Sequence, residues 1–530
     1  MATKSQEAAS GLSSGGDIEA VLSRSRSRTG VAPEDGTLKI RFSPLSMALF
    51  CFVVMSTAPA WAGSLGAALY AGGPTTMVFG FLIVFIASLC GAASLAEMVS
   101  IWPTAEGQIA WTEKLAPARC ASFLRYWVAW LTAAGWIAIT MSACFICSVS
   151  ITAIAAACNS SYVPKAWHTA MIFWALALFA LAANVWGTRL LSPMNNIVGA
   201  ISLSVTIVIV IVVLARHRGD YNSAKYVFTE LVNETGYSSK GIVFIIGMVS
   251  GAYSIMGYDS IAHLCEEMHE PAINAPKVMI GSVLSSLPAG MVFILAVLFT
   301  IKDIDAVATQ MFPILYILEQ ATRNLAGAII LTIAFTTLTA GTASIGTLAT
   351  AGRVVWSMSL EGGIPYSRWF TRISTTSHAP VRAMVVIAII EMLLVLIYIG
   401  NAALFNSIII LAISFLNLSY AVPTGLMLFR GRPSGHLPDA PFRMPRWLGM
   451  ICNSVALVYQ LFISFMLFVP TLHPVSASNM NYACALFGGA HIVGGIYWFF
   501  GGRKRIHAVH DSRLEVGEGN GIETDEMAKL

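Results

Sequence analysis

Long apolar runs, separated by short polar segments, occupy the chain from about residue 42 to residue 502. A helix that crosses a lipid bilayer needs about 20 apolar residues. The stretch 42–96 is long enough for two such helices, and its Gly72-Gly73-Pro74 turn would separate them, because glycine and proline together end helices. The pattern predicts an all-α membrane protein of twelve spanning helices, the other ten in residues 126–164, 166–188, 190–215, 241–258, 278–301, 324–352, 383–429 (two, divided near Gly400) and 447–502 (two, divided near His473).

The two ends of the chain have a different character. Residues 1–42 and 503–530 are polar and contain no apolar run of spanning length. This composition predicts disordered tails on either side of a twelve-helix domain over residues 43–502. An even number of spans places both tails on the same side of the membrane.

The composition supports a membrane protein and excludes other classes. Of the 530 residues, 56% are apolar and 11% are charged. A soluble domain has about 45–50% apolar residues and about 25% charged residues. The lipid bilayer is therefore the expected environment, and a soluble enzyme is excluded. A net charge of +4 gives no sign of a nucleic-acid partner. We expect no metal site and no cofactor, since Cys144 and Cys147 lie inside an apolar run as small packing residues.

Basic residues are concentrated on one side of the predicted spans. If both tails are cytoplasmic, 24 of the 31 lysines and arginines lie on cytoplasmic segments, as the positive-inside rule requires. Asn159 and Asn233 begin the two N-x-S/T sequons of the polar loops, and both loops fall on the outer side. We therefore expect glycosylation at these two asparagines, and a multi-pass protein of the plasma membrane or another endomembrane.

The distribution of chemically active residues narrows the function. No G-x-x-x-x-G-K-[ST] phosphate loop occurs, so we expect no ATPase domain. The histidines are scattered, whereas an intramembrane enzyme would need clustered ligands. A secondary transporter and a receptor or sensor remain. Secondary transporters often contain two inverted repeats whose first helices are broken at mid-membrane.

Both halves of the sequence contain such an interruption. In the first span, Pro59 has no N–H to donate, which would free the carbonyl of Met55, and amides near Gly63 and Ser64 would then begin a new helix. In the sixth span, residues 251–259 form a glycine-flanked weak point. Either interruption alone is typical of an ordinary kink. Their equivalent positions in the two halves predict a substrate site between them.

Several motifs resemble those of one known family. Residues 257–267 read G-Y-D-S-I-A-H-L-C-E-E and residues 274–277 read N-A-P-K, which is similar to the signature of fungal amino acid/choline permeases of the amino acid/polyamine/organocation superfamily. The resemblance implies two inverted repeats of five helices, with the first and sixth helices broken, followed by two C-terminal helices. It covers about residues 43–502, and further stretches that fit are 97–108, 162–168 and 361–365.

The resemblance also implies a function. Members of this family carry choline, 4-aminobutyrate, other amino acids or related amines, usually inward and with an ion gradient. We therefore expect a secondary active transporter of a small amine or amino acid, not an enzyme, that works by alternating access. An exporter of a specialised metabolite and a non-transporting nutrient sensor are the alternatives. Proton and sodium coupling both stay open, although the fifth span lacks the lysine found in some proton-driven relatives.

The substrate site is expected at the two interruptions. Where many family members have a glycine-rich break, this chain has Pro59 and Trp61, and an aromatic face attracts a cationic head group by about 0.5–2 kcal/mol. Trp61, Tyr253 and Asp259 are the residues that we most expect to contact substrate. The full set of predicted substrate-binding residues is Ser56, Thr57, Trp61, Gly63, Ser64, Tyr253, Gly257 and Asp259.

Ionisable residues near the sixth span are candidates for gating and coupling, because an ionised group in lipid is costly. Asp259 and His263 lie on one helical face, where they could share a proton, meet an amine or only order the break. Glu266 and Glu267 are expected at the cytoplasmic mouth. Lys277 and Arg353 are available there as partners, so an ion pair would close this mouth, and exchanging the charges of Glu266 and Arg353 would test one such pairing.

Two further positions complete the predicted set. Glu391 lies about nine residues into the ninth span, and for it we favour a structural partner over a proton relay. Ser359 and Glu361 stand where arginine and aspartate are common in the family. Since both face the cytoplasm in the predicted topology, they are expected to affect gating more than substrate choice.

Overall fold

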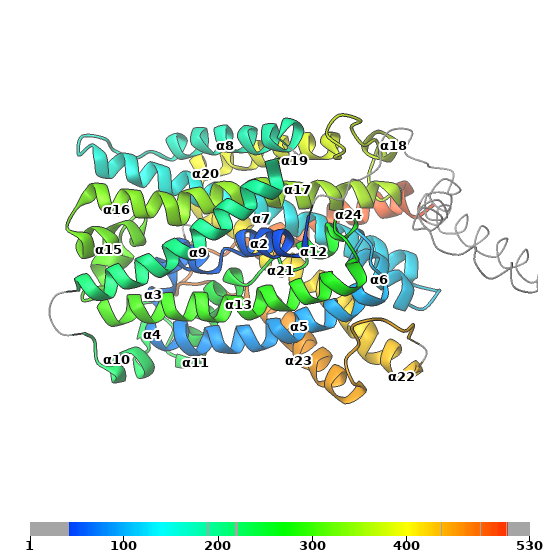
Figure 1. Cartoon of the computed structure of the whole chain (residues 1–530), viewed down its shortest axis with the longest axis horizontal. Coiled ribbons are helices and arrows are strands. Elements are labelled where there is room, and N and C mark those ends of the chain that lie inside the picture. The colour runs from blue at the N-terminus through cyan, green and yellow to red at the C-terminus, as the bar shows by residue number, and fades with distance from the viewer. Residues whose placement is uncertain are drawn as a thin grey trace, which may run out of the picture.

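The computed structural model describes residues 42–506 except 188–189, 218–220, 436, 477–478, 505 and the side chain of residue 305. The two predicted tails, 1–42 and 503–530, lie almost entirely outside the described residues. The described part is helical, and its long helices run side by side along the long axis of the molecule (Figure 1). It contains eleven helices that are long and apolar enough to cross a membrane.

The first span is a broken pair, α2 (Pro44–Met55) and α3 (Thr57–Tyr70). Ser43 caps α2 because its side chain accepts a hydrogen bond from the Ser46 amide. The later spans follow the apolar runs of the sequence, since only a helix satisfies every backbone group in lipid. They are α5 (Phe81–Ile101), α7 (Ala121–Cys158), α8 (Ala166–Trp186), α9 (Leu191–Arg216), α13 (Pro271–Thr300), α16 (Leu325–Thr332) with α17 (Leu338–Leu360), α19 (Val381–Leu394) with α20 (Leu396–Gly400), α21 (Ala402–Leu426), α23 (Arg446–Met466) and α24 (Ala483–Tyr497).

The sixth span is in two pieces, which explains why eleven and not twelve long helices are found in the described residues. It consists of α11 (Lys240–Ser254) and α12 (Ser260–His263), separated by a non-helical segment. α11 has 15 residues and is therefore about 22 Å long at 1.5 Å per residue. This is shorter than the hydrocarbon core of a bilayer, which is about 30 Å thick. The twelve predicted spans are present once these two pieces are joined.

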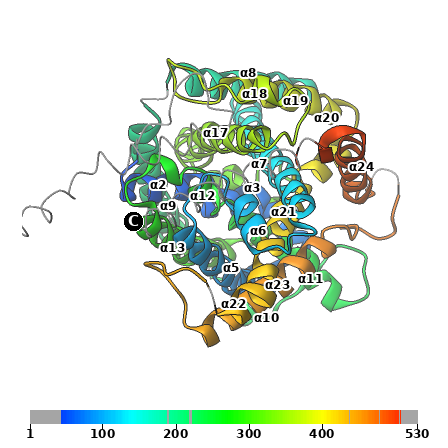
Figure 2. The ribbon, with the colours of Figure 1, turned by 90° about the vertical axis from the view of Figure 1, so that its right-hand side faces the viewer.

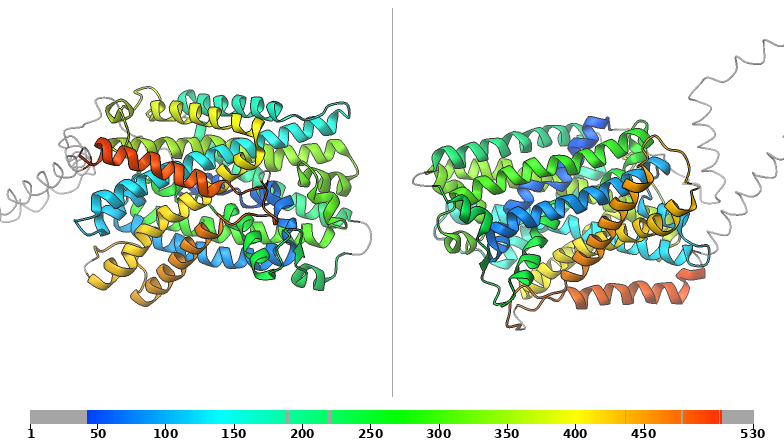
Figure 3. Two further views of the ribbon diagram at one scale, coloured as in Figure 1. Left: turned by 180° about the vertical axis from the view of Figure 1, so that it is seen from behind. Right: turned by 90° about the horizontal axis from the view of Figure 1, so that it is seen from below.

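The two broken spans lie at the centre of the bundle. Figure 2 looks along the helices and shows α3 and α12 among α5, α7, α13 and α17, with α2 beside α9. α2 also packs on α9, and α3 packs on α11. α24 contacts α21 and runs along the outside of the bundle (Figure 3). The exposed backbone at each break is thus surrounded by protein, where polar partners can satisfy it, and not by lipid.

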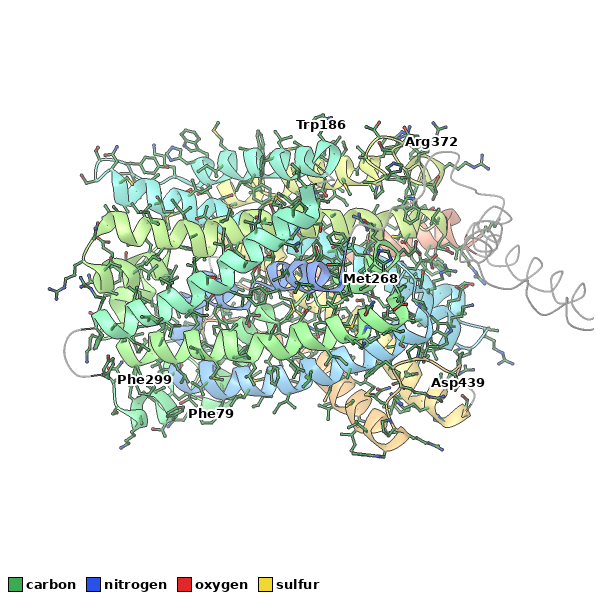
Figure 4. All side chains as sticks on the ribbon, in the orientation of Figure 1. Phe79, Trp186, Met268, Phe299, Arg372 and Asp439 are labelled. Atoms are coloured by element: carbon green, nitrogen blue, oxygen red, sulfur yellow. The ribbon has the colours of Figure 1, made fainter. Side chains whose placement is uncertain are left out.

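The two ends of the bundle differ in their connecting segments. One end, here named the α6 end, holds α6 (Gln108–Leu115), α18 (Ser367–Phe370) and α22 (Arg432–Ser434). In Figure 4 the labelled Arg372 and Asp439 lie at this end, whereas Trp186, which is 82% exposed, points outward from the side of the bundle. The opposite end, the α10 end, holds α10 (Ala224–Thr229), α14 (Ile304–Ala308), α15 (Pro313–Thr322) and the antiparallel pair β1 (Ala71–Gly72) and β2 (Val232–Asn233).

Candidate functional site

The first break lies at Ser56. Its backbone is left-handed, with φ 45° and ψ 43°, so α2 ends before it and α3 begins after it. Pro59 sits in the first turn of α3, where its missing N–H would have no intrahelical acceptor in any case. The helix N-terminus expected near Gly63 and Ser64 is therefore wrong by two turns. Both lie inside α3, and the Ser64 hydroxyl donates to the Ala60 carbonyl over 3.0 Å.

The second break follows Ser254 and requires a glycine. Gly257 has φ 95°, a conformation that other residues rarely adopt. A Cβ at this position would also lie 3.1 Å from Val54 of α2 and 3.6 Å from Trp136 of α7. Gly257 therefore allows the second break to approach the first, and the structure confirms that the first and sixth helices are both broken.

A small cavity lies between the two breaks. Its volume is about 40 Å³, far below that of pockets that enclose drug-sized ligands, which is about 300–1,000 Å³. The structure is therefore a closed state in which the cavity must widen to accept a substrate. No lining residue is charged; they are Val54, Met55, Ser56, Pro59, Ala60, Ile139, Ala143, Ile146, Tyr253, Met256, Ala340, Ala343 and Thr347.

Two of the predicted substrate residues line this cavity. They are Ser56 at the first break and Tyr253 at the end of α11. The Tyr253 hydroxyl is oriented by the hydroxyl of Ser142, 2.7 Å away on α7. Gly63 lies behind the lining residue Ile146, whose atoms would be 3.4 Å from a Cβ at position 63.

Trp61 occupies a different environment from the one expected. Its side chain is fully buried and meets Phe81 of α5 edge to face, with 5.6 Å between ring centroids. It is not among the residues that line the cavity. In this closed state Trp61 packs α3 against α5, and its contact with a cationic substrate stays a prediction.

Asp259 is fully buried and accepts hydrogen bonds from three helices. The Tyr420 hydroxyl of α21 donates to Oδ1 over 2.6 Å. Gln108 Nε2 of α6 and Trp136 Nε1 of α7 donate to Oδ2 over 3.0 Å and 3.1 Å. Asp259 does not line the cavity, so in this state it links the sixth span to α6, α7 and α21 and does not contact a substrate position.

His263 lies one helical turn after Asp259 and faces it. His263 Nε2 is 3.3 Å from Asp259 Oδ2. The other ring nitrogen, Nδ1, is 3.0 Å from the carbonyl oxygen of Ala105. His263 Nε2 makes no hydrogen bond among the described residues, so the structure shows a close contact that orders the second break, and a shared proton stays a prediction.

The ion pair predicted at the sixth span is formed with a different glutamate. Arg353 of α17 binds Glu267, with Nε and Nη2 each 2.5 Å from Oε1. Glu266 instead accepts a hydrogen bond from the Ala105 amide over 3.3 Å. The hypothesis of an inner ion pair is met by Glu267 and not by Glu266, because residues 265–267 form a 3-10 turn that directs one carboxylate to α17 and the other to the segment before α6.

A second ion cluster closes the same end. Arg125 of α7 lies 3.0 Å from Glu106, 2.7 Å from Glu113 of α6 and 2.5 Å from Glu361 after α17. Its side chain is 3% exposed. Glu361 was predicted to affect gating, and it lies within this cluster. We name the Glu267–Arg353 pair and the Arg125 cluster together the α6-end gate.

Glu391 of α19 lacks the structural partner that we favoured. Its residue exposure is 1%, and its Oε1 has no hydrogen-bond partner among the described residues. An ionised carboxylate without a partner in such a site would be very costly. Glu391 is therefore neutral in this state.

Sequence reasoning missed three residues that hold Asp259. Gln108, Trp136 and Tyr420 lie in segments far apart in the chain. Gln108 ends the family-like stretch 97–108, but Trp136 and Tyr420 lie outside the stretches that resemble the family. For Trp136 and Tyr420 the sequence could have predicted a polar partner, since buried tryptophans and tyrosines usually make a hydrogen bond. The partner itself depends on the packing of α7 and α21 around α12.

Comparison with known proteins identifies the family. The family model for amino acid permeases matches residues 42–490. The chain belongs to the amino acid permease family. The permease is 31% identical to the choline transporter of Saccharomyces cerevisiae over 513 residues, covering 94% of this chain and 89% of that one.

Two other relatives of the permease are also named as transporters. The swainsonine transporter of Arthroderma benhamiae is 29% identical, over 88% of this chain and 92% of that one. A polyamine transporter of Saccharomyces cerevisiae is 27% identical, over 80% of this chain and 69% of that one. With the inverted-repeat fold, these similarities make the permease a multi-pass secondary transporter of small amines or amino acids and not an enzyme.

Proposed function

We propose that the permease takes up a small amine with a single cationic head group, bound in the cavity between the two breaks. The carbonyl end of α2 reaches the cavity at Met55 and that of α11 at Tyr253. Helix C-termini carry partial negative charge and stabilise cations. Tyr253 adds an aromatic face, which favours an ammonium group further. This meeting of two helix C-termini is the observation that carries the proposal.

The uncharged lining of the cavity supports a substrate with one positive charge. The residues that line it include no carboxylate. A polyamine would bring several cationic groups, and those without a partner would bear a desolvation cost of several kcal/mol each. We therefore favour choline, 4-aminobutyrate or a small amino acid over polyamines. For a substrate that also bears a carboxylate, the first amides of α3 at Thr57 and Ala58 offer a helix N-terminus.

We further propose that the permease lies in the plasma membrane with the α6 end and both termini in the cytoplasm. The excess of basic residues on the segments of this end supports that orientation. Asn159 and Asn233 are exposed, and both lie in connecting segments at the α10 end, opposite the α6 end. This position suits glycosylation on the outer side of the membrane. For this orientation we propose inward transport, which is the usual direction in the family that the sequence resembles.

Purified permease in proteoliposomes tests this proposal. Counterflow of radiolabelled choline, 4-aminobutyrate, arginine and spermidine would be compared under equal conditions. We expect counterflow with choline or 4-aminobutyrate and none with spermidine. Binding without counterflow would indicate a sensor, and preference for spermidine would contradict the single-charge proposal.

A further inference from the structure

We propose that the loop between α17 and α19, residues 361–380, binds the phosphate groups of anionic phospholipids in the cytoplasmic leaflet of the membrane. Five residues of this loop and of the first turn of α19 form the binding surface, here named the α18 surface: Tyr366, Arg368, Trp369, Arg372 and Arg382. The choice of leaflet rests on the proposed orientation of the permease. The inference does not depend on which amine is carried.

Buried contacts fix the loop to the bundle. Trp356 of α17 is buried and donates its indole N–H to the Thr371 carbonyl over 3.0 Å. The side chains of Thr371 and Ile373 are buried, whereas Arg372 between them is exposed. α18 also packs on α17 and α19. The loop therefore has a buried side and an exposed side, and Arg372 belongs to the exposed side.

Arg382 and Trp369 join the two ends of the loop. The Arg382 guanidinium lies over the Trp369 ring, with 5.1 Å from Cζ to the ring centroid, and its Nη1 donates to the Trp369 carbonyl over 3.0 Å. An arginine has five N–H donors, so this bond uses only one of them. Stacking on an aromatic ring holds the plane of the guanidinium. Arg382 thus loses little freedom when it binds a phosphate.

Neighbouring carboxylates do not neutralise the α18 surface. Its three arginines make no ion pair within the part of the chain that the structure describes. Glu361, the acidic residue of the loop, is bound to Arg125 in the α6-end gate. Arginine recognises phosphate through two parallel N–H groups. Three arginines without a counter-ion therefore favour an anion that bears a phosphate group.

Exposed aromatic rings favour a lipid as the source of that phosphate. Tyr366 is 84% exposed and Trp369 is 45% exposed. Tyrosine and tryptophan are enriched where a membrane meets water. α18 lies at the edge of the bundle beside α19, away from α12 at the centre (Figure 2). A bilayer edge would take up both rings at the level of its headgroups, and the anionic lipids of the cytoplasmic leaflet attract basic residues next to a span.

Binding of a labelled lipid to purified full-length permease in detergent tests the inference. The probe is short-chain phosphatidylserine with a fluorescent acyl chain, and phosphatidylcholine with the same chains is the reference. Fluorescence anisotropy gives the Kd of each lipid. We expect the wild type to bind phosphatidylserine more tightly and R368Q/R372Q/R382Q to lose this preference. Each basic residue near an anionic surface contributes about fivefold in affinity, so the triple variant should bind phosphatidylserine about 100-fold more weakly.

A matched triple variant separates the α18 surface from the general charge of the α6 end. R430Q/R443Q/R446Q removes the same number of charges from exposed arginines at the same end of the bundle. Arg443 lies 3.5 Å from a carboxylate oxygen of Asp439, so its charge already has a counter-ion. We expect this variant to keep the preference for phosphatidylserine.

Two single variants keep the test decisive if the first triple variant fails to fold. Trp369→Ala retains every charge but removes the ring beneath Arg382, so the preference for phosphatidylserine should fall several-fold at unchanged net charge. Arg372→Gln changes an exposed side chain and should keep the melting temperature of the wild type. Its affinity for phosphatidylserine should fall about fivefold.

The outcomes that contradict the site are distinct. The site is overturned if the wild type shows no preference for phosphatidylserine, if folded R368Q/R372Q/R382Q retains it, or if R430Q/R443Q/R446Q loses it equally. Glycerophosphoserine is the same headgroup without acyl chains. If it displaces the probe as well as unlabelled short-chain phosphatidylserine does, the ligand is a soluble anion and not a lipid.

The test is also separate from the proposed function. Lipid binding is measured without flux, so a permease without counterflow would lose the uptake proposal and could still show this preference. An orientation opposite to the proposed one would overturn the choice of leaflet, whereas the loss of affinity in R368Q/R372Q/R382Q would still support a headgroup site.

Discussion

Arg353 binds Glu267 and not Glu266, although the two glutamates are adjacent in the chain. Both guanidinium contacts measure 2.5 Å, and both partners are almost completely buried. Glu266 faces the opposite way and accepts from the Ala105 amide. The two carboxylates therefore close the α6 end by different means, one through an ion pair to α17 and one through the segment before α6.

Removing Glu267 should impair transport more than removing Glu266. Glu267→Gln leaves Arg353 buried without its counter-ion, which costs about 3–5 kcal/mol, whereas Glu266→Gln removes one hydrogen bond worth about 1.5–3 kcal/mol. We expect a larger drop in uptake and in melting temperature for E267Q. Charge exchange in E267R/R353E should recover part of the uptake lost in the single variants, and E266R/R353E should not. Equal recovery in both double variants would contradict the observed pairing.

Tyr253 and Trp61 should have separable effects. Tyr253→Phe removes a hydroxyl whose hydrogen bond to Ser142 is worth about 0.5–1.5 kcal/mol of folding free energy, and because this bond orients the Tyr253 ring at the cavity we expect KM to rise with only this small loss of stability. Trp61→Ala opens a void beside Phe81 and should cost about 3–5 kcal/mol of folding free energy. Trp61→Phe is the control that keeps much of the packing. Uptake kinetics and melting temperature in detergent distinguish the two. A raised KM in folded W61F would return Trp61 to the substrate site.

The fold could be predicted from the sequence because lipid imposes a strong constraint on it. Apolar runs of spanning length, turn residues and the basic bias are local properties, and they define the spans. The breaks were also visible as Pro59 and Gly257. The position of the first break was not, since Ser56 takes a left-handed conformation that serine adopts only rarely.

The partners within the site could not be predicted for a related reason. A sequence places Asp259, Glu266 and Glu267 on one short segment but does not give the direction of each carboxylate. That direction depends on the 3-10 turn after α12 and on how α6, α7 and α21 approach it. Trp61 was assigned to the substrate by its chemistry; its ring packs against Phe81, but its buried indole N–H has no hydrogen-bond partner among the described residues.

Glu391 should tolerate an amide. Because its carboxyl is neutral and Oε1 lacks a hydrogen-bond partner in the described structure, Glu391→Gln keeps the charge and approximate shape of the side chain. We expect unchanged uptake, unchanged response to a pH gradient and a melting temperature equal to or above that of the wild type. Glu391→Lys is the contrast, because a buried unpaired cation should prevent folding. Loss of pH-driven accumulation in E391Q would make Glu391 a coupling residue.

The two exposed sequons provide a test of the proposed orientation. Glycans are added only on the luminal or outer side, so Asn159→Gln and Asn233→Gln should each increase electrophoretic mobility, and the double variant should no longer respond to glycosidase. A third sequon, Asn417-Leu418-Ser419, serves as an internal control. Asn417 is buried in α21 and donates to the Ile413 carbonyl over 2.9 Å. It should stay unmodified, so no glycan should remain once the other two are removed. If the wild type carries no glycan at either loop in a glycosylating host, the α10 end is not the outer one.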